Sequence, residues 1–178
     1  MNTYIAFLRG INVGGHKKVP MAELRALLSK IGLEKVQTYI QSGNVIFQSK
    51  ETDVKTLQAE IEKALFKHFE FEVPVLVITP QYLKQIFDDC PFSEDQKVNS
   101  YFMFLYSVPD KDLVKEVTEQ SYPNETFAVT DPSVYFYSSV GYGKAKCSNS
   151  FFERKLKVTA TARNYKTMVK LISLSLTN

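Results

Sequence analysis

The segment Leu8–Val19, LRGINVGGHKKV, contains the residue types that hold anions in proteins. Three glycines occur there with four side chains that are basic or can become so. A glycine-rich turn exposes backbone amides, and the helix expected after Pro20 adds partial positive charge at its start. We therefore predict that this loop binds a small phosphate-bearing or other anionic ligand. The predicted contacts are Arg9, Gly10, Asn12, Gly14, Gly15, His16 and Lys17.

The segment does not carry a known nucleotide-binding motif. Gly10 and Gly15 have the spacing of a P-loop, but His16 stands where the motif needs lysine, and Lys17 stands where it needs a hydroxyl residue. The Gly-x-Gly-x-x-Gly pattern of dinucleotide sites is absent as well. The competing interpretation is a surface loop whose glycines allow a bend and whose lysines serve solubility.

Residues that could catalyse a reaction are few. His16 lies inside the loop and could act as a general acid or base, so an enzyme acting on a small anionic metabolite is the alternative function. Cys90 and Cys147 lie far apart without a metal-ligand spacing, and no metal or cofactor is predicted. Cys147 stands among lysines, which lower thiol pKa values, although a buried and unreactive thiol is the favoured interpretation.

The elements that position the loop follow the order β-α-β-β-α-β over residues 1–80. Apolar patterning predicts strands at 3–8 and 75–78, a helix at 21–31, and a longer helix capped by Asp53. The segment VQTYIQSGNVIF predicts a hairpin with Gly43 in its turn. This order is typical of a ferredoxin-like fold, in which the first strand ends at the same edge as that turn. Gln41, Ser42 and Asn44 are therefore predicted to lie beside Arg9 and to complete the site.

Residues 81–178 are predicted to form a second, smaller α+β subdomain packed against the first. Its predicted elements are a helix at 81–88, a polar connection, a strand at 101–108, a helix from 110, strands at 125–130 and 133–138, and two carboxy-terminal helices. The first of these two helices is predicted to begin at a capping box formed by Ser150 and Glu153.

Positive charge gathers near both ends of the chain. Residues 141–170 contain eight Lys or Arg against one acid, Glu153, although the whole chain carries only +3. The predicted secondary basic surface consists of Lys144, Lys146, Arg163, Lys166 and Lys170. On the last helix, the basic residues are predicted to be exposed opposite buried Tyr165, Met168 and Ile172. A phosphodiester backbone suits such a stripe. The small net charge makes nucleic acid the less favoured partner, and a solvated lysine face is the plainer interpretation.

Composition favours a cytoplasmic globular protein. Hydrophobic residues make up 44% and charged residues 23% of 178, and no apolar run approaches the ~18 residues that span a bilayer. The amino terminus lacks the features of a signal peptide, and no membrane association is expected. An interaction module without a small ligand is the third function compatible with this composition.

Four segments resemble the bacterial family known as domain of unknown function 1697, DUF1697. They are FLRGINVGGHKKVPMAELR, TYIQSGNVIF, FFERKL and ATARNYKTMVKL, and the resemblance runs from Phe7 to Leu171. It implies a cytosolic α+β protein of two subdomains, the first ferredoxin-like, and it implies no activity. Tyr165 stands where the family motif usually has tryptophan, so a role that needs an indole N–H does not carry over, whereas a core aromatic position does.

Overall fold

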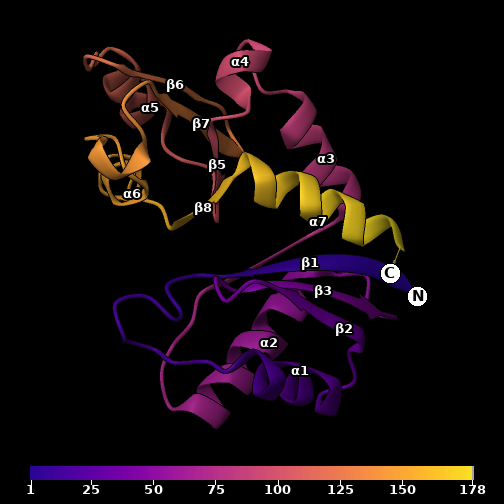
Figure 1. Cartoon of the computed structure of the whole chain (residues 1–178). Coiled ribbons are helices and arrows are strands. Elements are labelled where there is room, and N and C mark those ends of the chain that lie inside the picture. Colours follow the sequence, from indigo (N-terminus) through magenta and orange to yellow (C-terminus); the bar gives the residue numbers. More distant parts are fainter. Residues whose placement is uncertain (178) are drawn as a thin grey trace. The chain divides into compact units, whose positions relative to one another are not determined.

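A computed structural model describes residues 1–177, which form two compact units, each built on one four-stranded antiparallel sheet (Figure 1). Unit 1 comprises residues 1–84 together with the chain from Lys170 onward, and unit 2 comprises residues 85–169. Over the described residues there are seven α-helices, and none of them has the length and apolar character needed to cross a bilayer. The chain is therefore an α+β protein, as the sequence predicts.

Unit 1 follows the predicted element order. Its elements are β1 (Asn2–Leu8), α1 (Met21–Lys30), β2 (Glu34–Tyr39), β3 (Asn44–Ser49), α2 (Val54–Phe69) and β4 (Val75–Ile78). The helix α3 (Pro80–Asp88), where the predicted division at residue 80 falls, begins in unit 1 and ends in unit 2. The strand order is β2-β3-β1-β4, and every neighbouring pair is antiparallel. The strands β1 and β2 consequently run in the same direction, with β3 between them.

Helices α1 and α2 lie on one face of this sheet because each presents an apolar stripe to it (Figure 1). The stripe of α2 contains Leu57, Ile61 and Leu65 at helical spacing, and all three side chains are fully buried. Asp53 starts this helix by accepting hydrogen bonds from two amides of its first turn. The opposite face of the sheet, which includes Phe7, is buried as well.

The open edge of β4 is closed by side chains of α2. The Val75 amide donates to Glu62 Oε1 over 2.8 Å, and the Val77 amide donates to Gln58 Oε1 over 3.1 Å. These amides point away from β1 and would otherwise be unpaired donors at a sheet edge. Unit 1 therefore does not offer β4 as a template for pairing with another strand.

Unit 2 carries the second sheet, with strand order β6-β7-β5-β8. Its elements are α4 (Glu94–Lys97), β5 (Tyr101–Leu105), α5 (Lys111–Thr118), β6 (Glu125–Val129), β7 (Ser133–Ser138), a short 3-10 helix (Tyr142–Lys144), α6 (Asn149–Leu156) and β8 (Ala160–Asn164). The last helix, α7 (Tyr165–Thr177), begins in unit 2 and continues into unit 1.

Aromatic side chains dominate the core of unit 2. Phe152 of α6 lies at the centre, and the rings of Phe127, Phe136 and Phe151 all contact it edge-on. Edge-to-face pairs of this kind add to the stabilisation from apolar burial. The core therefore fixes α6 against β6 and β7.

The second half of the chain departs from the prediction at three places. The strand β8 was not predicted, the strand predicted at 101–108 ends at Leu105, and α4 lies within the connection that was predicted to be irregular. The sequence of β8, ATARN, has little β-propensity. Its extended conformation follows from pairing with β5, from which about 60 residues separate it in the chain.

The predicted capping box is wrong. Helix α6 begins at Asn149, and its N-cap is Ser148, two residues before Ser150, with the Ser148 hydroxyl accepting from the Phe151 amide. Glu153 instead accepts a 2.8 Å hydrogen bond from the Ala160 amide at the start of β8. The Glu153 side chain therefore holds the start of β8, the strand that was not predicted.

Arg163 does not belong to an exposed basic stripe, which corrects the prediction. It lies in β8, is only 7% exposed, and donates to the Thr161 hydroxyl over 2.7 Å and to the Ala162 carbonyl over 2.8 Å. Burial lowers the pKa of its guanidinium to about 10, against a smaller opposing effect of Tyr106. Lys166 and Lys170 are exposed and Met168 is buried, as predicted. Tyr165 and Ile172, which were predicted to be buried, are only partly buried.

Candidate functional site

The structure brings the amino-terminal loop and the hairpin turn together. The Leu8 amide donates to the Gly43 carbonyl over 2.8 Å, and the Asn12 side-chain amide donates to the Gln41 carbonyl over 2.9 Å. The end of β1 and the β2–β3 turn therefore lie next to each other at the same end of the strands, as the strand order requires.

Two of the loop glycines form a tight turn. Gly14 and Gly15 have φ values of +57° and +78°, and the His16 amide donates to the Val13 carbonyl over 3.0 Å. Two consecutive residues with positive φ between a bonded pair are typical of a type I′ hairpin turn. Next to it, the Asn12 amide donates to the Lys17 carbonyl over 3.1 Å. The glycines thus shape a miniature hairpin, and two loop amides are used within it.

Several predicted ligand contacts are engaged in holding the loop itself. Asn12 donates through its side-chain nitrogen to the carbonyls of Val19 and Gln41, and its oxygen accepts from the Val19 amide. The Lys17 ammonium donates to the Glu72 carbonyl over 2.6 Å. Asn44 is fully buried and closes the hairpin turn by donating to the Tyr39 carbonyl and the Ser42 hydroxyl. These side chains position the edge of the sheet.

An open hollow of about 580 Å³ lies between the loop, the turn and the start of α1. We call it the α1 hollow, and its lining residues are Asn12, Gly15, Lys18, Val19, Pro20, Met21, Ala22 and Gln41. Pro20 precedes the helix and supplies no side-chain cap for the amides of the first turn. Unsatisfied amides, the helix dipole and an exposed lysine together favour an anion at this point.

The α1 hollow contains only part of the predicted site. Asn12, Gly15 and Gln41 line it. The other predicted contacts, Arg9, Gly10, Gly14, His16, Lys17, Ser42 and Asn44, are not among the residues that line it in the described part of the chain. Lys18 does line it, although the prediction gave more weight to Lys17. Lys17 and Lys18 are adjacent in the sequence, so only the geometry of the turn shows which of them lines the hollow.

The acidic residue of the first turn of α1 is paired away from the hollow. Glu23 lies 2.6 Å from the imidazole of His68, which is in the last turn of α2. Glu23 carries the one carboxylate in the first turn of α1, and His68 is its partner.

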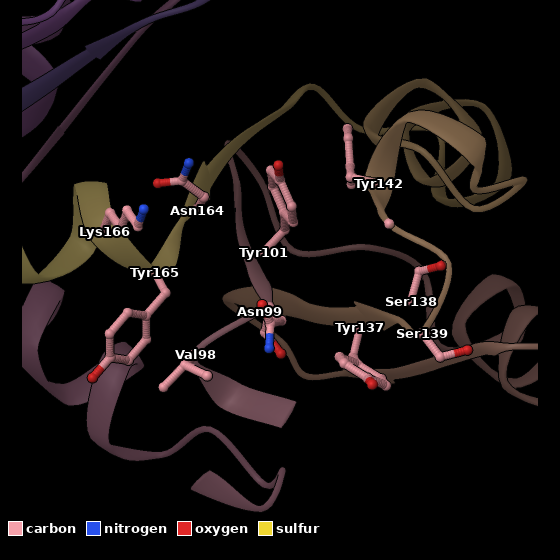
Figure 2. A pocket seen from close by; sticks show the side chains of 12 residues that line it. Val98, Asn99, Tyr101, Tyr137, Ser138, Ser139, Tyr142, Asn164, Tyr165 and Lys166 are labelled. Atoms are coloured by element: carbon pink, nitrogen blue, oxygen red, sulfur yellow. The ribbon is translucent and has the colours of Figure 1, made fainter. Parts of the chain in front are cut away.

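Unit 2 contains a second hollow, of about 510 Å³, which the sequence did not predict (Figure 2). We call it the tyrosine hollow. It lies where β5 and α7 begin and where β7 and β8 end, and its lining includes four tyrosines, Tyr101, Tyr137, Tyr142 and Tyr165. Polar groups surround them, among them Asn99, Asn164, Ser138, Ser139 and Lys166. Three separate chain segments, 98–101, 137–142 and 164–166, therefore build this hollow.

Two of the tyrosine rings form a fixed stack. The ring centroids of Tyr101 and Tyr142 are 4.0 Å apart, with planes inclined by 22°. The Tyr142 hydroxyl accepts a 2.9 Å hydrogen bond from the Asn149 amide, and burial raises its pKa. Phe136 contacts the Tyr142 ring edge-on. Figure 2 shows that the Tyr165 ring points away from this stack. The Tyr165 ring packs against Phe87.

The remaining members of the predicted basic surface are dispersed. Lys144 and Lys146 do not line either hollow among the described residues. The Lys146 amide, together with the amide of Cys147, donates to the Glu125 carboxylate. Lys166 lines the tyrosine hollow, and Lys170 lies one helical turn further along α7.

Cys147 is fully buried in this structure. Burial, and next the neighbouring Glu125 carboxylate, raise the pKa of its thiol to about 12. Cys90 is only partly buried, and burial raises its pKa as well. Because the thiolate is the nucleophile, we expect iodoacetamide at pH 8 to modify native Cys90 slowly and to leave Cys147 unmodified.

Peptide mass spectrometry after timed alkylation measures this difference. Alkylation in denaturant is the control, in which both cysteines should react. Modification of native Cys147 at the rate of Cys90 would contradict the buried assignment.

No group of three or more potential metal ligands is present in residues 1–177.

Comparisons with known proteins place the chain among uncharacterised relatives. A family model described as protein of unknown function (DUF1697) matches residues 1–135. The structure resembles that of the conserved bacterial protein SP0830 from Streptococcus pneumoniae, with a TM-score of 0.75 and 26% sequence identity over 97% of this chain and 98% of that chain. None of the curated proteins matches.

Proposed function

Since the chain belongs to the DUF1697 family of proteins of unknown function, we propose its function from the geometry of the site: it binds a small phosphate-bearing or other anionic ligand in the α1 hollow. The observation that carries the proposal is the start of α1, which has no side-chain cap and opens onto a hollow lined by Lys18. Helix starts of this kind hold phosphate through backbone amides.

The hollow suits a compact ligand. Gln41 offers a side-chain amide on one side, Lys18 a positive charge, and Met21 and Ala22 belong to the first helical turn. Lys18 is the one charged side chain among the described residues that line the hollow. Asn12 serves as a positioning residue, because its side-chain nitrogen ties the loop to the turn through the Gln41 carbonyl and holds the end of the loop through the Val19 carbonyl.

This proposal gives His16 no catalytic role. The imidazole stands outside the lining of the α1 hollow as the structure describes it, although His16 is exposed and close to the Gly14 turn. Binding is therefore favoured over catalysis. We also infer a ferredoxin-like fold for unit 1, which its element order and strand order support, and a cytoplasmic location without a membrane partner.

Replacing each of the two adjacent lysines with alanine, in separate variants, tests the proposal. We expect Lys18→Ala to weaken the binding of inorganic phosphate or pyrophosphate about tenfold, because a charge-assisted hydrogen bond is lost. Lys17→Ala is the matched control, since the Lys17 ammonium is held by the Glu72 carbonyl. Its affinity should stay within about twofold of the unmodified protein, because a single exposed charge contributes little at a distance.

Titration by NMR supplies the location as well as the affinity. Phosphate should shift the amide resonances of Met21 and Ala22 most strongly. Equal losses in the two lysine variants, or shifts spread over the surface without a maximum at α1, would disprove the α1 hollow as the site.

A further inference from the structure

We propose that the tyrosine hollow of unit 2 is a second binding site, which takes a nucleotide unit. Its planar base would lie against the Tyr101–Tyr142 stack, and its phosphate would lie at the start of α7 beside Lys166. All residues that carry this inference belong to unit 2. The site is distinct from the α1 hollow and does not depend on it.

The stack provides an aromatic platform whose position is fixed. Tyr142 is held through its hydroxyl by the Asn149 amide and through its ring by Phe136. Tyr101 stands at the first position of β5, and both tyrosines remain partly exposed. Bases of any identity stack on aromatic rings of this kind.

A buried hydroxyl at this hollow lacks a partner. Ser138 is 7% exposed, and its Oγ has no hydrogen-bond partner among the described residues. It stands two residues after Phe136, whose direct partner in the sheet is Tyr101. Side chains alternate along a strand, so Ser138 lies on the same face as the stack. Buried polar groups without partners are rare in folded proteins. A polar group of a ligand, reached after a small rearrangement, would satisfy it.

The opposite side of the hollow is electropositive. Asn164, the direct partner of Tyr101 in the sheet, caps α7 by accepting from the Thr167 amide over 2.9 Å. Lys166 lies in the first turn of this helix, where the dipole also favours an anion. Figure 2 shows Asn164 and Lys166 together at one side of Tyr101. No carboxylate is present among the described residues of the lining.

Stacking surface and positive charge on either side of one hollow match the two chemical parts of a nucleotide. The volume of about 510 Å³ lies in the range of small-molecule sites. A free nucleotide and a single-stranded nucleic acid present the same base and phosphate, so both are tested as sources of the ligand.

The test compares two lysines one turn apart on α7. Calorimetric titration with adenosine monophosphate should show about tenfold weaker binding for Lys166→Ala, whereas Lys170→Ala, which removes a charge outside the lining, should bind like the unmodified protein. Adenosine, which lacks the phosphate, should bind both variants equally and should bind Tyr101→Leu about tenfold more weakly.

A short single-stranded oligoadenylate at two salt concentrations distinguishes the sources. Tighter, strongly salt-dependent oligonucleotide binding with the same Lys166 dependence assigns the site to nucleic acid, and equal affinity per nucleotide assigns it to a free nucleotide. Absence of binding by all three probes, or equal losses for Lys166→Ala and Lys170→Ala, would overturn the proposal. Should Tyr101→Leu fail to fold, the lysine comparison still decides. Lys18→Ala should leave this site unchanged, so the two sites can fail independently.

Discussion

Replacing Gly43 with alanine is expected to destabilise the protein by about 3 kcal/mol, the largest effect of any single methyl group added at the loop or turn. Gly43 has a φ of +82°, and a Cβ there would lie 2.7 Å from the Leu8 carbonyl oxygen and 2.8 Å from the Leu8 Cβ. Neither contact can relax by moving a flexible side-chain end. The backbone of β1 would have to move, which weakens the 2.8 Å bond between Leu8 and Gly43.

Gly10→Ala is the matched control for this change. Gly10 has a similar φ of +74°, but a Cβ there meets no atom within 4 Å. Its substitution should cost only the left-handed conformation, about 1 kcal/mol. Urea unfolding followed by circular dichroism measures both values. Equal losses in the two variants would show that the close approach to Leu8 does not exist in solution.

Glu125→Ala is expected to destabilise unit 2 by about 2 kcal/mol at neutral pH. The Glu125 carboxylate accepts hydrogen bonds from the Lys146 amide over 2.7 Å and from the Cys147 amide over 2.9 Å. Without it, these two donors at the start of the α6 segment lose their partner, and that of Cys147 is buried. Thermal unfolding of the variant at pH 7 measures the loss.

The same carboxylate predicts a dependence on pH. Burial acts to raise the pKa of Glu125, but the amide hydrogen bonds outweigh it, and the pKa is lowered. The stabilisation is therefore fully present above the unfolded pKa of about 4.3 and is lost as the pH falls through the lower folded value. The difference in stability between unmodified protein and Glu125→Ala should thus shrink as the pH falls below the unfolded pKa of about 4.3. A difference that stays constant with pH would contradict this assignment.

The sequence predicts unit 1 well because its signals are local. Leu57, Ile61 and Leu65 repeat at helical spacing beside an obvious N-cap, and Gly43 marks the turn of a hairpin. The convergence of that turn with the end of β1 then follows from the order of the strands. The sequence does not show how Lys17 is engaged. Its ammonium is held by the Glu72 carbonyl, and that contact joins residues 55 positions apart.

Unit 2 could be predicted less well because its decisive contacts are distant in sequence. Strand β8 is extended only because β5 pairs with it, and Arg163 is buried for the same reason. The tyrosine hollow is assembled from three segments, around residues 99, 140 and 165. Each tyrosine taken alone looks like an ordinary strand, loop or helix residue, and the stack of Tyr101 on Tyr142 has no pattern in the sequence.

The division of the chain has a consequence for how the protein folds during synthesis. Unit 1 includes residues 1–84 and also the chain from Lys170 onward, so all of unit 2 is translated between its two parts. Translation proceeds at about 5–20 residues per second, and domains made of one continuous segment fold as they emerge. Unit 2 can do so, whereas unit 1 must wait several seconds for its last helical segment. Translation therefore begins with unit 1, but unit 1 is completed after unit 2.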